Sequence, residues 1–233
     1  MVSLLKHYQP SIIGMQEVVN GQLNYLVANL PNFASIGVGR EDGKEKGEYS
    51  PILYDTKLLK LLKSSTFWLS DTPDKISVGW DAALERICTY ALFKDLKTNK
   101  QFWVFNTHFD HIGVVAREKS TLLIVSKIKE LNTENLPVVL MGDLNLSPEE
   151  TPIQYLSQEL IDGQLITQKT FYGPTGTFNG FDQDRILKNR IDYIFVDSFY
   201  VLEYIHIDDR MENNKHISDH LPVLAKINIE NKF

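Results

Sequence analysis

The stretch Leu136-Pro137-Val138-Val139-Leu140-Met141-Gly142-Asp143-Leu144-Asn145 joins an apolar run to an acid and an amide two residues apart. A short apolar run bounded by turn residues predicts a buried strand. In open α/β sheets, ligands bind beyond the carboxyl ends of strands. The carboxylate of Asp143 accepts hydrogen bonds, whereas the amide of Asn145 both donates and accepts them. The pair is suited to holding a water molecule against an electrophile, although Gly-Asp-x-Asn is also an ordinary turn sequence.

Length, composition and charge limit the classes of protein to consider. The 233 residues are 43% hydrophobic, which is enough for one sizeable core, so we expect a single domain over 1–233. Lys and Arg number 24 against 30 Asp and Glu, which gives a formal net charge of −6. Affinity for duplex nucleic acid depends on neutralising phosphates with Lys and Arg. The acidic balance therefore argues against a general duplex binder, but not against a small phosphate ester.

The cysteine count and the hydropathy of the chain do not determine its cellular compartment. Cys88 is the only cysteine, which excludes an intramolecular disulfide and a cysteine-rich zinc site. Its apolar surroundings predict a buried thiol. No apolar run reaches the length of a membrane-spanning helix, and no signal peptide is visible. The sequence leaves open whether the protein is cytoplasmic or, with a signal peptide upstream of Met1, secreted.

Strand-like runs outnumber helical ones along the chain. Runs rich in β-branched and aromatic residues predict strands over 12–16, 51–54, 66–69, 88–93, 102–107, 138–141, 191–196, 201–207 and 221–229. Helical spacing of apolar residues predicts helices over 22–30 and 117–131, and residues 1–8 read as the end of a helix. Many strands with few helices favour two sheets packed face to face with helices outside.

Polar chemistry recurs where these runs end. Besides Asp143 and Asn145, the candidates are Glu17, His108, Asp192, Asp219 and His220. Each has a structural alternative: a helix-start acid, a core histidine, an acid paired with a nearby arginine, or a turn. Any one site is as well explained by its alternative. Their repetition at five strand ends favours a shared catalytic site.

Five segments, in this order along the chain, resemble the endonuclease/exonuclease/phosphatase (DNase I-like) superfamily. They are Gly14-Met15-Gln16-Glu17, Asn106-Thr107-His108, Gly142-Asp143-Leu144-Asn145, Arg190-Ile191-Asp192-Tyr193-Ile194 and Ser218-Asp219-His220-Leu221-Pro222. Further segments resemble a little-characterised bacterial branch of it: Gly47-Glu48-Tyr49-Ser50-Pro51, Phe67-Trp68-Leu69-Ser70, Trp80-Asp81 and Arg86-Ile87-Cys88. The set is specific for the superfamily but not for a substrate.

The resemblance implies a four-layer α/β/β/α sandwich of two mixed, mainly antiparallel sheets, with the site at one end. Glu17 would bind Mg²⁺ or Mn²⁺, hard cations that prefer oxygen ligands. Asp219 would be a second carboxylate on the metal side. Asp143 would orient or deprotonate the attacking water, and Asn145 would hold that water and a phosphate oxygen.

The resemblance implies further roles for two histidines and an arginine. His220 would contact the scissile phosphate, and Asp192 would fix its tautomer. His108 would contact phosphate or assist the leaving oxygen, oriented by Glu48. Arg86 is the candidate phosphate-binding arginine that falls inside a matching segment.

One departure from the superfamily pattern concerns its first strand, which carries an Asn that supports the metal and phosphate site. This chain has no such Asn before the helix ending near Tyr8. We expect an N-terminally truncated domain: if residues 1–233 are the whole protein, its metal site is weakened and a sheet edge is exposed, whereas if the gene is longer, the chain is a fragment of a competent enzyme.

The activity expected from these features is metal-dependent hydrolysis of a phosphate ester. A phosphodiester is favoured, which would make the protein a phosphodiesterase or nuclease, with nucleic acid or a phospholipid head group as possible substrate. The alternatives are a phosphomonoesterase of the same superfamily and a binding module that keeps the fold without turnover. Substrate choice depends on loops around a common site, so the sequence does not decide it. It is also silent on oligomeric state.

Overall fold

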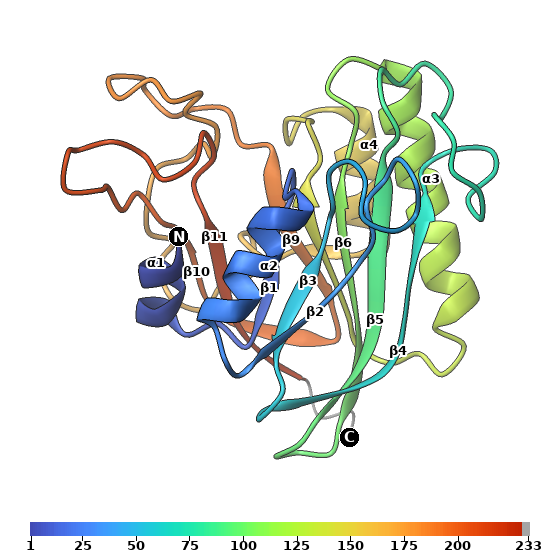
Figure 1. Ribbon diagram of the computed structural model, residues 1–233, viewed down its shortest axis with the longest axis horizontal. Coiled ribbons are helices and arrows are strands. Elements are labelled where there is room, and N and C mark those ends of the chain that lie inside the picture. The colour runs from blue at the N-terminus through green and yellow to red at the C-terminus, as the bar shows by residue number, and fades with distance from the viewer. Residues whose placement is uncertain (230–233) are drawn as a thin grey trace.

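A six-stranded sheet forms the centre of the structure, a computed structural model that describes residues 1–229 (Figure 1). In spatial order its strands are β4 (Leu59–Trp68), β5 (Ile87–Asp95), β6 (Gln101–His108), β7 (Val138–Asp143), β9 (Asp192–Asp197) and β8 (Ile161–Asp162). Neighbouring strands are antiparallel except β6 and β7, which run parallel. The carboxyl ends of β6 and β7 therefore meet at the same end of the sheet.

A second layer of strands covers one face of this sheet. It consists of two groups, β1 (Ile12–Gly14), β3 (Ile52–Asp55) and β2 (Phe33–Ile36) in one, and β10 (Phe199–His206) and β11 (Val223–Ile229) in the other. All pairs within this layer are antiparallel. Within residues 1–229, β1 pairs only with β3 and β11 only with β10. The second sheet expected from the sequence is thus two separate sheets in one layer.

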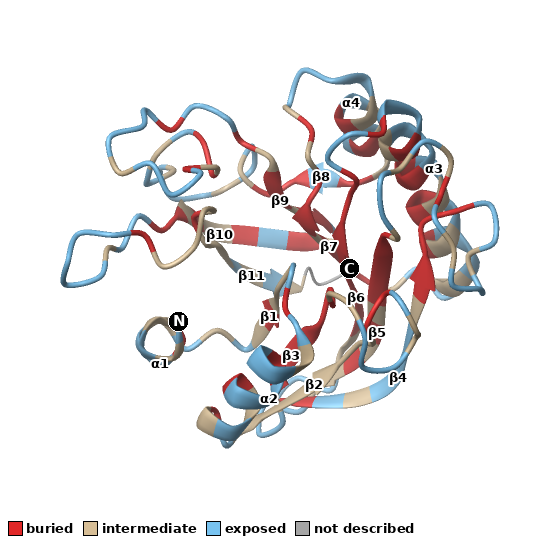
Figure 2. Cartoon of the chain, turned by 45° about the horizontal axis from the view of Figure 1, so that its top comes forward, coloured by how far each residue is buried: buried red, intermediate tan, exposed pale blue. Residues whose placement is uncertain are grey.

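Helices cover the outer faces. The helices α3 (Val114–Leu131) and α4 (Thr151–Glu159) pack on the six-stranded sheet through a core that includes Ile124 and Leu156. On the opposite side, α1 (Val2–Tyr8) and α2 (Asn20–Asn29) cover β1 and β3. The core between the two strand layers appears as buried positions along β5, β6, β7 and β9 (Figure 2). This confirms the four-layer sandwich. Within the described part of the chain, no helix has both the length and the hydrophobicity to span a membrane.

Three elements, α4, β2 and β8, were missed by sequence reasoning because each is short or lacks a clear pattern. The helix α4 has nine residues and buries only Ile153 and Leu156, so its apolar repeat is a single step of three residues. The strand β2 is half-buried at every position, so it shows no alternation. By contrast, the predicted helix over 117–131 is confirmed as most of α3.

Candidate active site

Three candidate residues lie side by side in one row across the end of the six-stranded sheet. His108 on β6 is in register with Asp143 on β7, and Asp143 is in register with Asp192 on β9. Residues two apart on a strand share a face, and the positions two and four residues from this row, such as Val104 and Ile194, pack in the core between the strand layers. All three side chains therefore belong to the face that meets the second layer.

The turn after β7 is built around a glycine and an asparagine. Gly142 has φ 148°, and a Cβ placed there would lie 2.0 Å from the backbone oxygen of Thr107, so only glycine fits. Asn145 has φ 48°, and its backbone N–H donates to Oδ1 of Asp143 at 2.8 Å. Its Nδ2 donates to the backbone oxygen of Phe109 at 3.1 Å. These contacts fix the carboxylate and the amide beside each other, as the sequence predicted.

His220 lies on the segment that leads into β11, in the second strand layer, and contacts the Asp192 end of the row. Its Nδ1 donates to Oδ2 of Asp192 at 2.8 Å, which leaves Nε2 3.8 Å from Oδ2 of Asp143. The ring of Phe178 packs edge-on against the imidazole, and the backbone N–H of His220 donates to Oγ of Ser218. The predicted pairing of His220 with Asp192 is therefore present in the structure.

The charges of this group are strongly coupled. Burial and the adjacent charge of Asp192 raise the pKa of Asp143 to about 7. Burial alone would lower the pKa of His220, but its hydrogen bond to Asp192 and the charges of Asp192 and Asp143 raise it to about 9. Near neutral pH, His220 is a cation and Asp143 lies close to its midpoint of ionisation. This is the condition that suits a general base at physiological pH.

Two acids from the second layer face His108. Glu17 follows β1 with φ 59°, and its half-exposed carboxylate lies 3.9 Å from Nδ1 of His108. Glu48 precedes β3 and pairs with the buried Arg40, whose Nη1 lies 2.7 Å from its carboxylate. These residues line a cavity of about 10 Å³ together with Ser50 and others. That volume holds roughly one water molecule or ion.

Asn106, two residues before His108 on β6, connects the two strand layers. It is fully buried, and its Nδ2 donates to the backbone oxygens of Met15 and Pro51. Its Oδ1 accepts from Nε2 of Gln16 at 2.7 Å. The segment that carries Glu17 is thereby held against the end of β6, which explains how a distant acid reaches the row.

Arg86 makes three contacts that the sequence did not predict. This buried guanidinium lies 2.9 Å from Nδ1 of His108 and 3.0 Å from Nδ1 of His111, and Nε donates to Asp110 at 3.4 Å. Burial and the neighbouring guanidiniums of Arg86 and Arg40 hold the pKa of His108 well below its usual range. In this geometry Arg86 lies at Nδ1 of His108 and Glu48 is paired with Arg40, so the orienting role of Glu48 stays a prediction.

Within residues 1–229, carboxylates and imidazoles form two groups that could hold a cation. In each of the two, the ligand atoms lie within 4.8 Å of one another. The first group is Glu17, Glu48 and His108, and the second is Asp143, Asp192 and His220. Asp219 is in neither, although its charge acts on His220. Its role as a metal ligand stays a prediction.

Two residues beside the site have partners that the sequence did not predict. Arg40 lies in a charged loop, but its side chain is buried and paired with Glu48. His111 had no motif around it, and its contact with Arg86 follows from the turn after β6. Its spacing of three residues from His108 was the only available signal.

Comparisons with known proteins identify the family to which this fold belongs. The mannosyl-6-phosphatase of Bacteroides thetaiotaomicron superimposes with a TM-score of 0.93 at 38% identity, covering 98% of this chain and 89% of that one. An uncharacterised protein of Acanthamoeba polyphaga mimivirus is 29% identical over 96% of this chain and 88% of its own length. A Saccharomyces cerevisiae protein named as a probable RNA exonuclease is 28% identical over 65% of this chain and 32% of its own length. The sequence profile of the Endonuclease/Exonuclease/phosphatase family matches residues 1–220. The chain therefore belongs to the Endonuclease/Exonuclease/phosphatase family, whose members hydrolyse phosphate esters.

Proposed function

We propose that this protein is a metal-dependent phosphate ester hydrolase that uses an activated water as nucleophile. The observation that carries the proposal is the row His108–Asp143–Asp192, closed by His220 at one end and faced by Glu17. The row places a base, hydrogen-bond donors and a carboxylate around one point, as hydrolysis of a phosphate ester requires.

Glu17 would hold Mg²⁺ or Mn²⁺. Its carboxylate is half exposed, so it is free to bind a cation from solvent, and the cavity beside it has the size of one ion. Glu48 would support the site while paired with Arg40. When bound, the cation supplies charge that neutralises the developing negative charge on the phosphate oxygens.

Asp143 and Asn145 would position the attacking water. The carboxylate of Asp143, with its pKa raised to about 7, accepts a proton from that water at neutral pH. The amide of Asn145 lies beside it and orients the same water. Attack from this side places the leaving group on the opposite face of the phosphorus.

His220 would stabilise negative charge on the phosphate. Its imidazole is cationic at neutral pH, because its pKa is raised to about 9, and Asp192 fixes Nδ1 as a donor. Nε2–H is then available to a phosphate oxygen. Such preorganised donors act on charge that develops in the transition state.

A phosphomonoester of a sugar is the substrate class that the comparisons favour. The support is the likeness to a mannosyl-6-phosphatase, at 38% identity over nearly the whole chain. A phosphodiester, such as nucleic acid, is the second candidate, and the support is the shorter likeness to a protein named as an RNA exonuclease. A phospholipid head group carries the same phosphate chemistry.

The test is turnover on a panel that separates these classes. Mannose 6-phosphate, a short RNA oligonucleotide and bis(p-nitrophenyl) phosphate are incubated with the protein and Mg²⁺, with EDTA and Asp143→Asn as controls. We expect phosphate release from mannose 6-phosphate that EDTA and Asp143→Asn both abolish. Cleavage of the diesters alone would make the protein a phosphodiesterase. Absence of turnover on every substrate, with retained binding of inorganic phosphate, would favour a non-catalytic binding module.

A further inference from the structure

Every nitrogen of the Arg86 guanidinium already has a protein partner. Nη1 lies 2.9 Å from Nδ1 of His108, Nη2 lies 3.0 Å from Nδ1 of His111, and Nε donates to Asp110. The residue is 4% exposed. Because each nitrogen already donates one N–H to a protein group and the residue is buried, a role inside the protein fits this arrangement better than binding of the substrate phosphate.

The contact with His108 determines which ring nitrogen carries the proton. A guanidinium has only donors, so Nδ1 of His108 must accept. A neutral imidazole has one acceptor and one donor nitrogen, so the proton of His108 is on Nε2. That N–H lies on the side of Asp143, whose Oδ2 is 3.4 Å away.

Other neighbours of His108 would support the opposite tautomer. Glu17 lies 3.9 Å from Nδ1 and could accept a hydrogen bond from it. On the other side, Nδ2 of Asn145, which is a donor, lies 3.2 Å from Nε2. With a proton on Nδ1, both of these contacts would become favourable. The guanidinium of Arg86 is the group that prevents this arrangement.

Asp110 keeps Arg86 in place. Its carboxylate accepts backbone N–H bonds from Ala83, Ile112 and Gly113, at 2.7 to 3.1 Å, in addition to Nε of Arg86. Burial would raise the pKa of Asp110, but these hydrogen bonds and the charge of Arg86 outweigh it and lower the pKa to about 2. The acid is therefore ionised at any working pH and holds the guanidinium at a fixed position.

We infer that Arg86 is a positioning residue that holds His108 as the Nε2–H tautomer, so that His108 is a hydrogen-bond donor toward the reacting phosphate and neither a base nor a metal ligand. The inference rests on the proposed function for its catalytic meaning. The tautomer itself is a property of the resting protein. It also revises the sequence-based expectation that Arg86 binds substrate.

The first measurement is of the tautomer by two-bond ¹H–¹⁵N NMR of protein labelled in histidine. The signal of His108 is assigned from its loss in His108→Gln. In the unmodified protein we expect a protonated Nε2 and an unprotonated Nδ1. In Arg86→Met, which removes every donor with little change in volume, we expect the proton to move toward Nδ1. A protonated Nδ1 in the unmodified protein, or an unchanged pattern in Arg86→Met, would overturn the inference.

Kinetics separate a positioning role from substrate binding. Losing one preorganised donor lowers kcat by about a hundredfold, so we expect Arg86→Met to reduce kcat on this scale with KM and the inhibition constant of inorganic phosphate changed less than about threefold. A large rise in KM and weaker phosphate inhibition, with kcat retained, would assign Arg86 to substrate binding instead.

A second variant keeps the test informative if Arg86→Met does not fold. Arg86→Lys retains the charge beside Asp110, but its single ammonium cannot donate hydrogen bonds to both His108 and His111. It should show a mixed tautomer at His108 or at His111. If the NMR result holds and no ester is hydrolysed, then the proposed function fails while the positioning by Arg86 stands.

Discussion

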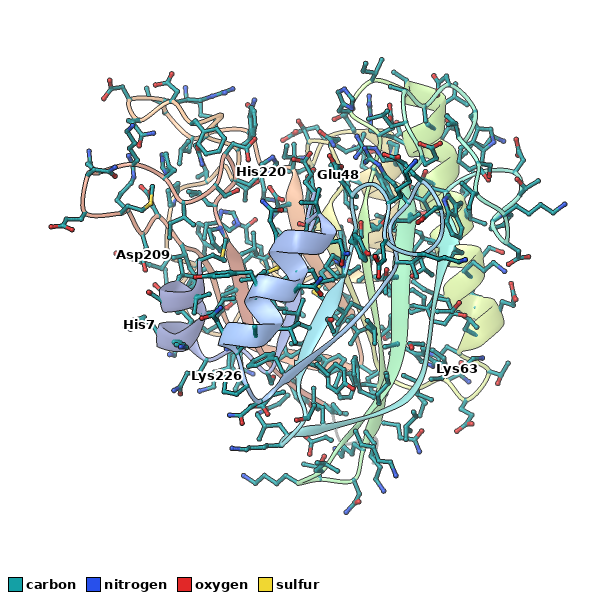
Figure 3. The ribbon with its side chains drawn as sticks, in the orientation of Figure 1. His7, Glu48, Lys63, Asp209, His220 and Lys226 are labelled. Atoms are coloured by element: carbon teal, nitrogen blue, oxygen red, sulfur yellow. The ribbon has the colours of Figure 1, made fainter. Side chains whose placement is uncertain are left out.

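Asp143 and Asp192 lie directly opposite each other on the adjacent antiparallel strands β7 and β9. Like charges in opposite positions destabilise a sheet, and here the repulsion, together with burial, raises the pKa of Asp143. His220 relieves part of it through its hydrogen bond to Asp192. Figure 3 shows His220, from this charged group, and Glu48, from the other group that could hold a cation, at the same end of the sandwich. The pair accounts for the raised pKa of Asp143, on which its proposed role as a base rests.

Replacing Asp143 with Asn should abolish activity and increase stability. Loss of the general base is expected to lower kcat by about 10² to 10⁴. Because the pKa of Asp143 is higher in the folded state than in the unfolded state, its ionisation destabilises the fold as pH rises toward 7. Asp143→Asn should therefore be more stable than the unmodified protein at pH 8, by about 1 to 4 kcal/mol, and the difference should vanish near pH 4.

Urea unfolding at the two pH values measures this difference. Asp197→Asn, at the exposed far end of β9, is the matched control and should change neither activity nor stability. Equal stability of Asp143→Asn and the unmodified protein at pH 8 would show that the pair is not strained.

The dependence of kcat on pH should be bell-shaped. Asp143 must be ionised to accept a proton, so activity should rise as pH increases through about 7. His220 must be protonated to stabilise the phosphate, so activity should fall as pH increases through about 9. A bound cation adds positive charge nearby and moves the acid limb to lower pH. A profile with no alkaline limb up to pH 10 would argue against His220 as a cation.

Replacing Asp192 with Asn should move both limbs of that profile in the same direction. The acid limb moves to lower pH because Asp143 loses the adjacent negative charge. The alkaline limb moves to lower pH because His220 loses its ionic hydrogen bond. The measurement is kcat against pH for the variant and the unmodified protein. A shift of only one limb would show that Asp192 acts on one partner alone.

Metal binding should depend more on Glu17 than on Glu48. Glu17→Gln removes the half-exposed carboxylate that is free to bind Mg²⁺, whereas Glu48→Gln disturbs a residue that is already paired with Arg40. Isothermal titration with Mg²⁺ should show about tenfold weaker binding for Glu48→Gln, as for a supporting partner, and a larger loss for Glu17→Gln. Glu45→Gln, in the same loop and exposed, should match the unmodified protein. The reverse order would place the cation nearer Glu48.

Removing the carboxylate of Asp110 should destabilise the fold. Asp110→Ala leaves the buried Arg86 without its ionic partner and three backbone N–H groups without their acceptor. Breaking a buried pair costs about 3 to 5 kcal/mol. Urea unfolding at pH 7 measures the effect, with Asp74→Ala, at an exposed turn position, as the control. A loss below about 1 kcal/mol would mean that the turn after β6 tolerates an unpaired Arg86.

The sequence by itself determined most of the strands of the six-stranded sheet and the polar residues that end them. Alternation and apolar runs identify β6, β7 and β9, and the position of Asp143 at the end of β7 follows from the glycine before it. The pairing of His220 with Asp192 followed from the resemblance to a family. These features were accessible because each depends on a local pattern or on an ordered set of motifs.

Only the tertiary structure decided which charged side chain contacts His108 and which is paired elsewhere. The segment before β3 and the segment before β5 both bring a charged residue toward His108, and the sequence did not predict the contact between Arg86 and His108. The outcome depends on the reach of each side chain across two strand layers and on Arg40, which neutralises Glu48. No periodicity along the chain encodes such distances, because they arise when separate sheets pack against each other.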